Sequence, residues 1–273
     1  MLDKVCFLMA VYHLDKIEFL KQSINSVLNQ DYPNFEVVIV ADGTLTPELE
    51  YYLNKKANEC PNLHLISGRN ERRGLAYSLN EGINYILKNI DARFIARMDS
   101  DDISQPSRLS RQVKYMRTEN VDVSGTACLE IDSNGVCIDS RKVDTSHSRL
   151  FFNIIKRCPF VHPSVIISIS IFKSGYRYDS KLKNSQDYEL WVRLARDGYI
   201  FGNIDEPLIY FRRDENFFSR RSYNKSFNEL KSKFFAMKSL SLFTVSNVTI
   251  SILLFVLRLM PEVVSKFAYK NFR

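Results

Sequence analysis

The chain begins with a regular alternation between short apolar runs and segments whose apolar residues recur every three or four positions. The apolar runs predict four strands, at residues 5–11, 35–40, 63–66 and 94–98. The periodic segments predict four helices, at residues 16–28, 47–57, 75–87 and about 106–116. Because strands that alternate with helices build βαβ units, we expect a mostly parallel sheet that is buried on both faces.

The pattern changes after about residue 119. Two runs at 121–131 and 136–142 flank Asp132-Ser133-Asn134-Gly135, which predicts a turn and therefore an antiparallel hairpin. Further along the chain we expect helices and strands in alternation, at residues 148–155, 165–169, 187–196 and 208–212.

From about residue 222 the pattern is helical throughout. Residues 239–257 carry no charge, a length that would permit a membrane span, but their Ser, Thr and Asn content argues against one. Residues 263–272 mix apolar and basic side chains. We favour helices that lie on an anionic membrane surface, while helices that cover the rest of the protein, or that pair two chains, stay open.

The charge distribution sets this tail apart. The 273 residues carry a net charge of +7, but from Arg212 onwards there are 12 Lys and Arg against four acids, a charge of +8. The preceding part is therefore close to neutral, and we expect the tail to meet an anionic partner. Long apolar runs between the basic residues argue against nucleic acid.

The composition restricts the class of protein. A hydrophobic content of 45% with 25% charged residues excludes a disordered chain, and a mean hydropathy of −0.20 excludes a polytopic membrane protein. Five cysteines without metal-site spacing, and no segment typical of a signal peptide, favour a reduced, cytoplasmic location.

An acidic motif follows the strand at 94–98. Asp99, Asp101 and Asp102 lie at the expected carboxyl edge of the sheet, where their mutual repulsion would be relieved by Mg²⁺ or Mn²⁺. A solvated loop that caps the next helix, through Asp102 or Ser104, explains the motif equally well.

Weaker candidates lie elsewhere on the chain. Asp42 follows the strand at 35–40, and Gly43 next to it permits close approach of a ligand, although an ordinary turn has the same residues. Arg72 and Arg73 precede a helix, and their guanidinium groups suit a diphosphate or are a solvated charge pair. Asp187 is a candidate general base or a helix cap, and His162 a candidate ligand or a structural histidine.

Taken in this order, the motifs resemble the family 2 glycosyltransferases of the GT-A fold, over roughly residues 3–213. The resemblance is carried by an opening βαβ unit and by four motifs: Asp42-Gly43, Arg73-Gly74-Leu75 with Leu79-Asn80-Glu81-Gly82, Asp99-Ser100-Asp101-Asp102, and Asp187. The variants Arg97-Met98-Asp99, His162-Pro163 and Asp187-Tyr188-Glu189-Leu190-Trp191 are most similar to transferases for amylovoran-type exopolysaccharides and bacterial O-antigens.

The resemblance implies an α/β fold with a Rossmann-like, mostly parallel central sheet and flanking helices. A GT-A domain would occupy residues 1–213, with a nucleotide-sugar half at about 1–118 and an acceptor half at about 119–213. Residues 214–273 would form a C-terminal helical extension.

The resemblance also implies roles for individual residues. The metal, Mn²⁺ or Mg²⁺, would be held by Asp101, Asp99 and His162, and Asp187 would be the general base of an inverting reaction. Gln186 and Trp191 would lie on the acceptor side. The nucleotide-sugar would contact seven residues: Ala10, Tyr12, Asp42, Arg73, Arg97, Asp99 and Ser100. The chain departs from the family at Ala41 and Gln186, where an acid is usual.

The implied reaction moves a sugar from a nucleotide-sugar, with UDP the commonest carrier, to a hydroxyl of a polyprenyl-diphosphate-linked glycan in bacterial surface polysaccharide synthesis. The enzyme would sit on the inner face of the cytoplasmic membrane through residues 222–273, and a homodimer stays open. Two alternatives remain. Ala41 and Gln186 suit a non-catalytic assembly protein with a degenerate fold, and a sugar nucleotidyltransferase would need a Gly-rich loop where Tyr12-His13-Leu14-Asp15 stands.

Overall fold

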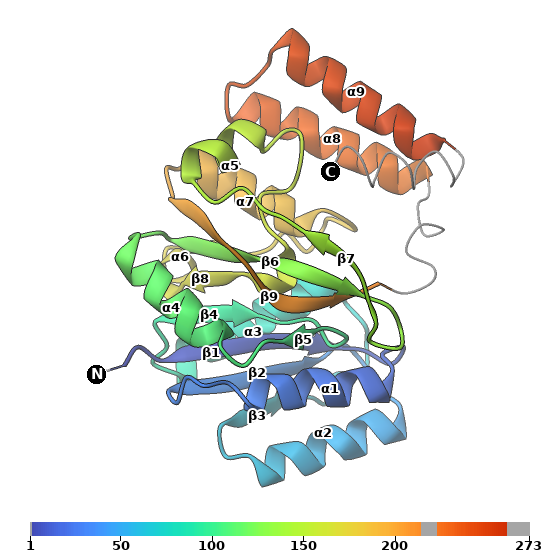
Figure 1. Cartoon of the computed structure of the whole chain (residues 1–273). Coiled ribbons are helices and arrows are strands. Elements are labelled where there is room, and N and C mark those ends of the chain that lie inside the picture. The colour runs from blue at the N-terminus through green and yellow to red at the C-terminus, as the bar shows by residue number, and fades with distance from the viewer. Residues whose placement is uncertain (1, 214–222, 261–273) are drawn as a thin grey trace.

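The computed structural model describes residues 2–213 and 223–260, and within these ranges a nine-stranded sheet runs through the molecule (Figure 1). Eight strands follow the order β3-β2-β1-β4-β8-β6-β9-β5, and β7 pairs with β6. The first four strands are mutually parallel: β1 (Val5–Val11), β2 (Phe35–Ala41), β3 (Leu63–Ile66) and β4 (Phe94–Arg97). These are the four strands that the apolar runs predict.

Alternate residues of β1 face two different helical layers. Phe7 and Met9 pack in the cluster that holds α1 (Ile17–Leu28), α2 (Pro47–Glu59) and α4 (Arg108–Thr118). Leu8 packs in the other cluster, against α3 (Leu75–Asn89). The sheet is thus buried on both faces, as the continuous apolar runs predict.

The second half is a mixed sheet. The predicted hairpin is present as β6 (Val123–Ile131) and β7 (Cys137–Arg141), and β8 (Ile166–Ser168) and β9 (Phe201–Arg212) complete it, together with the short β5 (Ile103–Ser104). β8 is antiparallel to β4 and β6, whereas β9 runs parallel to β6.

Two sequence predictions in this half are wrong in extent. The strand expected at 165–169 ends at Ser168, and the chain turns directly into α6 (Ile169–Lys173). The strand expected at 208–212 begins seven residues earlier, at Phe201. Its pairing with β6 shifts register near Pro207, and since proline cannot donate to a ladder, this stretch looks like a loop in the sequence.

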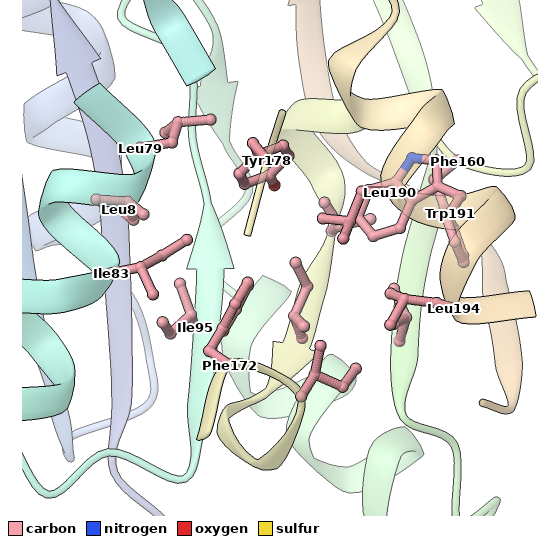
Figure 2. Packing of buried hydrophobic residues seen from close by; sticks show 14 of the residues in the cluster. Leu8, Leu79, Ile83, Ile95, Phe160, Phe172, Tyr178, Leu190, Trp191 and Leu194 are labelled. Carbon is pink, nitrogen blue, oxygen red and sulfur yellow. The ribbon is translucent and has the colours of Figure 1, made fainter. Parts of the chain in front are cut away.

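The remaining elements of the acceptor half connect these strands. They are α5 (His147–Asn153), the short η1 (His162–Ser164) and α7 (Gln186–Arg196). Figure 2 shows one apolar cluster that runs from Leu8 and Ile83 past Ile95 to Trp191 and Leu194, so the two halves share a core.

The C-terminal part forms two helices that lie side by side at one end of the molecule, α8 (Tyr223–Ser239) and α9 (Val245–Leu259) (Figure 1). The charge-free stretch 239–257 is therefore not one helix. The chain turns at Ser241, whose φ is 55°, and Thr244 caps α9 by accepting a hydrogen bond from the Asn247 amide at 3.2 Å. Throughout 2–213 and 223–260, every helix is too short or too polar to cross a bilayer.

α8 belongs to the same core as the transferase-like part. Ala236 and Met237 are fully buried in the cluster that contains Leu190 and Trp191. The reading in which these helices cover the rest of the protein is therefore correct for α8, and the change of charge near residue 213 marks no boundary between cores. The helix expected at 263–272 lies outside the described residues.

Candidate functional site

Three polar segments meet at one edge of the parallel sheet. Tyr12, Asp42 and Asp99 follow the carboxyl ends of β1, β2 and β4, which are neighbours in the order β2-β1-β4. The chain leaves β1 towards β2 and β3 and returns to β4 on the other side, so the order of strands reverses between β1 and β4. Ligands of open α/β sheets bind at such a switch point.

Asp42 organises a loop at this edge. Its buried carboxylate accepts hydrogen bonds from the amides of Arg73, at 2.9 Å, and Gly74, at 3.0 Å, and from the Arg69 guanidinium at 3.1 Å. Gly43 beside it has φ +85°, and a Cβ there would come within 2.9 Å of the Arg72 nitrogen. In this structure the predicted nucleotide-binding acid thus holds the 69–74 loop. Sequence reasoning missed Arg69, which no motif marked.

Two exposed guanidinium groups flank the Asp42 loop. Arg72 lies over the Tyr12 ring, 4.6 Å from its centroid, with its Nε 3.6 Å from the Asp42 carboxylate. Arg73 stacks on Tyr77 and donates to its hydroxyl at 2.9 Å. Both arginines that the sequence places before the helix are therefore cations at this edge. Ala10 is half-buried in β1.

Arg97 supports the acidic motif from beneath. Its side chain is 2% exposed, donates to the Asp99 carboxylate and to the Leu8 carbonyl, and has no surface to offer a ligand. β4 thus carries the Arg97 guanidinium into the interior, and its contact with the nucleotide stays a prediction that this burial does not favour. Ser23 of α1 fixes the Asp99 carbonyl from the other side, at 2.8 Å.

The carboxyl groups at this edge destabilise one another. The pKa of Asp101 is raised, first because the surrounding protein desolvates its carboxylate and then because the negative charges of Asp99 and Asp15 lie nearby. Asp15 accepts hydrogen bonds from the Tyr12 amide, at 3.0 Å, and from Ser100, and burial raises its pKa to about 6. Asp15 is a further member of the acidic cluster that the sequence motifs did not include. Such a cluster favours a cation.

The expected three-ligand metal set is not assembled. Among the described residues, no three His, Cys, Asp or Glu side chains converge as a metal site requires, and the assignment of Asp99, Asp101 and His162 as ligands stays a prediction. His162 instead pairs with the hydroxyl of Tyr178, its Nε2 lying 3.1 Å away. Asp99 and Asp101 alone fit Mg²⁺ or Mn²⁺, which proteins often hold through one or two carboxylates together with substrate phosphates.

A distant arginine holds the acidic loop in place. Arg212, at the end of β9, donates from Nε to the Asp101 carbonyl at 2.9 Å, from Nη1 to the Asp132 carbonyl at 3.0 Å and from Nη2 to Gln22 at 2.6 Å. Its backbone amide donates to Asp102 at 2.7 Å. Asp102 is 1% exposed, so it anchors the loop and cannot meet a ligand. The sequence placed Arg212 in a strand but offered no indication of these contacts.

Asp187 stands on the opposite side of the same region. It is the second residue of α7, which starts after Ser185 in the left-handed conformation, φ 61°. The carboxylate is half-exposed, and the Cys158 thiol lies 3.9 Å from it. Burial and the charge of Arg97 lower the pKa of His162, while both Asp187 and Asp99 act against that shift. His162 is therefore near enough to Asp99 and to Asp187 for both charges to act on it.

The two predicted acceptor-side residues differ in position. Gln186 is half-buried and donates to the Leu182 carbonyl at 2.7 Å, which ties down the loop before α7. Trp191 is fully buried between Phe160 and His162, with ring centroids 5.1 and 6.4 Å away. The Trp191 ring is thus part of the core, and its role on the acceptor side stays a prediction that this burial does not favour.

Residues 6–174 match the family model described as glycosyl transferase family 2. The chain belongs to this family. It is thus a glycosyltransferase, and the sugar nucleotidyltransferase alternative is set aside.

Relatives of known name agree in length as well as in sequence. The O-antigen biosynthesis glycosyltransferase WbnJ of Escherichia coli is 30% identical over 222 residues, which cover 77% of this chain and 80% of WbnJ. The amylovoran biosynthesis glycosyltransferase AmsE of Erwinia amylovora is 28% identical over 270 residues, which cover 97% of this chain and 98% of AmsE.

Solved structures share the fold at lower identity. TarS of S. aureus, residues 1–349 in complex with UDP-GlcNAc, superposes with a TM-score of 0.63 at 17% identity, over 96% of this chain and 82% of that one. The mannosyltransferase PcManGT of Pyrobaculum calidifontis, in complex with GDP-Man and Mn²⁺, gives 0.57 at 15% identity, over 98% and 80%. The GT-A fold predicted from the motifs is thereby confirmed.

Proposed function

We propose that this glycosyltransferase is inverting and metal-dependent, and that it moves a sugar from a UDP-sugar to a hydroxyl of a lipid-linked glycan during bacterial surface polysaccharide synthesis. One observation carries the proposal. The Asp42 loop and the acidic loop at Asp99–Asp101 lie at a single switch point of the sheet, and the charges of Asp99 and of the candidate base Asp187 both act on His162. The names of WbnJ and AmsE support the surface polysaccharide.

The residues divide the chemistry between two sides. Arg72 and Arg73 meet the diphosphate, and Asp101 with Asp99 holds the metal, which neutralises the leaving diphosphate when it is bound. Asp187 takes the proton from the acceptor hydroxyl. The acceptor oxygen forms its bond to the anomeric carbon from the face opposite the nucleotide as the bond to the diphosphate oxygen breaks, so the configuration inverts.

UDP is the proposed carrier, supported by the UDP-GlcNAc complex of TarS, while the GDP-Man complex of PcManGT makes GDP the competing choice. Thermal unfolding with UDP-, GDP- and TDP-sugars, each with and without Mn²⁺, separates them, because a ligand that binds only the folded state raises its stability. A rise with UDP-sugars that needs Mn²⁺ is expected. A rise with GDP-sugars alone would replace the carrier, and no rise from a folded protein would contradict the proposal.

The acceptor side includes a membrane contact. The outward face of α9 presents an apolar row at helical spacing, with its largest exposed fractions at Val245 (86%), Leu253 (54%) and Ile252 (47%). The inward face carries Ser251, 1% exposed, against α8. The apolar side of this helix faces solvent, and the sequence from Arg212 onwards is rich in Lys and Arg. Both features suit an anionic lipid surface, where a polyprenyl-linked acceptor would lie.

Vesicle flotation with the full chain tests the membrane contact. Co-flotation with vesicles that contain anionic lipid, and weaker flotation with neutral vesicles, is the expected result. A protein that stays with the soluble fraction and migrates as a dimer in solution would assign the α9 face to a second copy.

A further inference from the structure

A buried lysine links α8 to the acceptor side of the site. Lys233 is 6% exposed, and its ammonium donates hydrogen bonds to the carbonyl of Ile155 and, at 3.2 Å, to that of Lys156. A buried ammonium is costly unless several acceptors satisfy it, and here burial lowers the pKa of Lys233 to about 8. Lys233 therefore contributes two hydrogen bonds to backbone carbonyls that an apolar residue at this position of α8 could not make.

The two carbonyls belong to the turn at residues 154–158, which follows α5. A third carbonyl of this turn, that of Ile154, accepts a hydrogen bond from Tyr188 at 3.0 Å, and Tyr188 is the residue after Asp187. The turn ends at Cys158, whose thiol lies 3.9 Å from the Asp187 carboxylate. The turn thus accepts hydrogen bonds from Tyr188 of α7 and from Lys233 of α8, and its last residue, Cys158, lies next to the candidate base.

We propose that Lys233 is a positioning residue: it holds the 154–158 turn against the start of α7 and thereby fixes the surroundings of Asp187. The catalytic consequence rests on the proposed function of Asp187 as the base, whereas the structural consequence does not. The helical pair α8 and α9 is then part of the catalytic unit, so that Lys233 adds a polar connection to the apolar contacts that already join α8 to α7.

Cys158 supplies a readout that is independent of activity. Its thiol is exposed. Desolvation by the surrounding protein and the nearby Asp187 charge raise its pKa, whereas the Lys233 charge lowers it, and a thiol with a raised pKa is expected to react slowly with a maleimide. The experiment measures the rate of maleimide labelling of the full chain in a background of Cys60→Ser and Cys137→Ser, since Cys6 and Cys128 are buried.

Lys233→Met is the decisive variant, and Lys238→Met, on the exposed side of α8, is its control. We expect labelling of Cys158 to quicken at least about threefold in Lys233→Met, because a turn that is no longer held moves the thiol away from the Asp187 carboxylate and from the protein groups that desolvate it. Loss of the Lys233 charge alone acts in the opposite direction, since that charge lowers the pKa of the thiol, so faster labelling reports the released turn. Lys233→Arg, which keeps the charge and the donors, should restore a slow rate, and Lys238→Met should leave it unchanged. Should Lys233→Met fail to fold, Lys233→Gln takes its place with a smaller rise expected.

The proposal would be overturned if Cys158 were labelled at the same rate in Lys233→Met, or in Lys233→Gln where that variant replaces it, as in the parent protein. It would also be overturned if Lys238→Met increased the labelling rate as much as Lys233→Met does. Transfer kinetics then test the catalytic consequence. We expect Lys233→Met to lower kcat about tenfold with the donor KM changed less than about twofold, because misplaced groups cost rate and not donor binding. Faster labelling with unchanged kcat would leave Lys233 as a holder of the turn and would count against Asp187 as the base.

Discussion

The two sides of the site are fastened by different means. On the donor side, buried guanidinium groups hydrogen-bond to the acidic loop. Arg97 donates to Asp99, and Arg212, at the end of β9, donates to the carbonyl of Asp101. On the acceptor side Asp187 stands at a helix start, and its neighbour Cys158 is held only through a turn. A rigid donor side suits a ligand of constant shape, the nucleotide diphosphate.

Replacing the candidate base gives the sharpest test of this division. Asp187→Asn should lower the transfer rate about 10³-fold, within the usual range for a general base, while nucleotide binding stays as it is. Initial rates of nucleotide release and isothermal titration with UDP measure the two effects. Weakened UDP binding in this variant would show that the two sides are not separate.

The next largest effect falls on the donor side. Asp101→Ala should lower metal-dependent transfer by about 10²-fold, because one ligand of the charge-neutralising metal is lost while Asp99 remains. The Mn²⁺ concentration that gives half-maximal rate should rise at the same time. Asp102→Asn is the matched control, because Asp102 is buried against Arg212 and cannot reach the metal. Equal loss of rate in the control would point to loop stability and not to metal binding.

The support of the acidic loop predicts a loss of stability. Arg212→Met removes a buried side chain that donates to four carbonyl or amide oxygens on three separate segments, and should cost about 3 kcal/mol of the free energy of unfolding. Arg212→Lys should cost nearly as much, because an ammonium cannot replace the planar fork. Urea denaturation measures both. A change below about 0.5 kcal/mol, typical of a surface substitution, would show that the network is dispensable.

The smallest expected effect concerns α9. The double change Ile252→Glu and Leu253→Glu should weaken binding to anionic vesicles about tenfold, since two half-exposed apolar side chains together contribute on the order of 1.5 kcal/mol. Ser246→Glu, a polar and exposed position on the same helix, is the control. The free energy of unfolding should change little in either variant. Unchanged flotation would remove α9 from the membrane contact.

Much of the architecture could be predicted from the sequence because it depends on local periodicity. The parallel strands β1 to β4 and helices α1 to α3 stand where the apolar runs and helical spacing put them. The family motifs likewise brought Asp42, Asp99 and Asp101 to one edge, because residues that follow adjacent parallel strands meet there. The first half of β9 was not predicted, because Pro207 and the register shift near it break the pattern of a regular strand.

The sequence by itself determined the order of elements, the family and the identity of the acidic motif, all of which follow from neighbours along the chain. Only the tertiary structure decided which side chains hold the loops of the site in place. Arg97 and Trp191 were candidates for ligand contact and are buried, while Arg69, Arg212 and Lys233 carried no motif and hold the loops of the site. The physical reason is that a buried charge is placed by the acceptors that satisfy it, and for Arg212 and Lys233 those acceptors lie about 80 or more residues away.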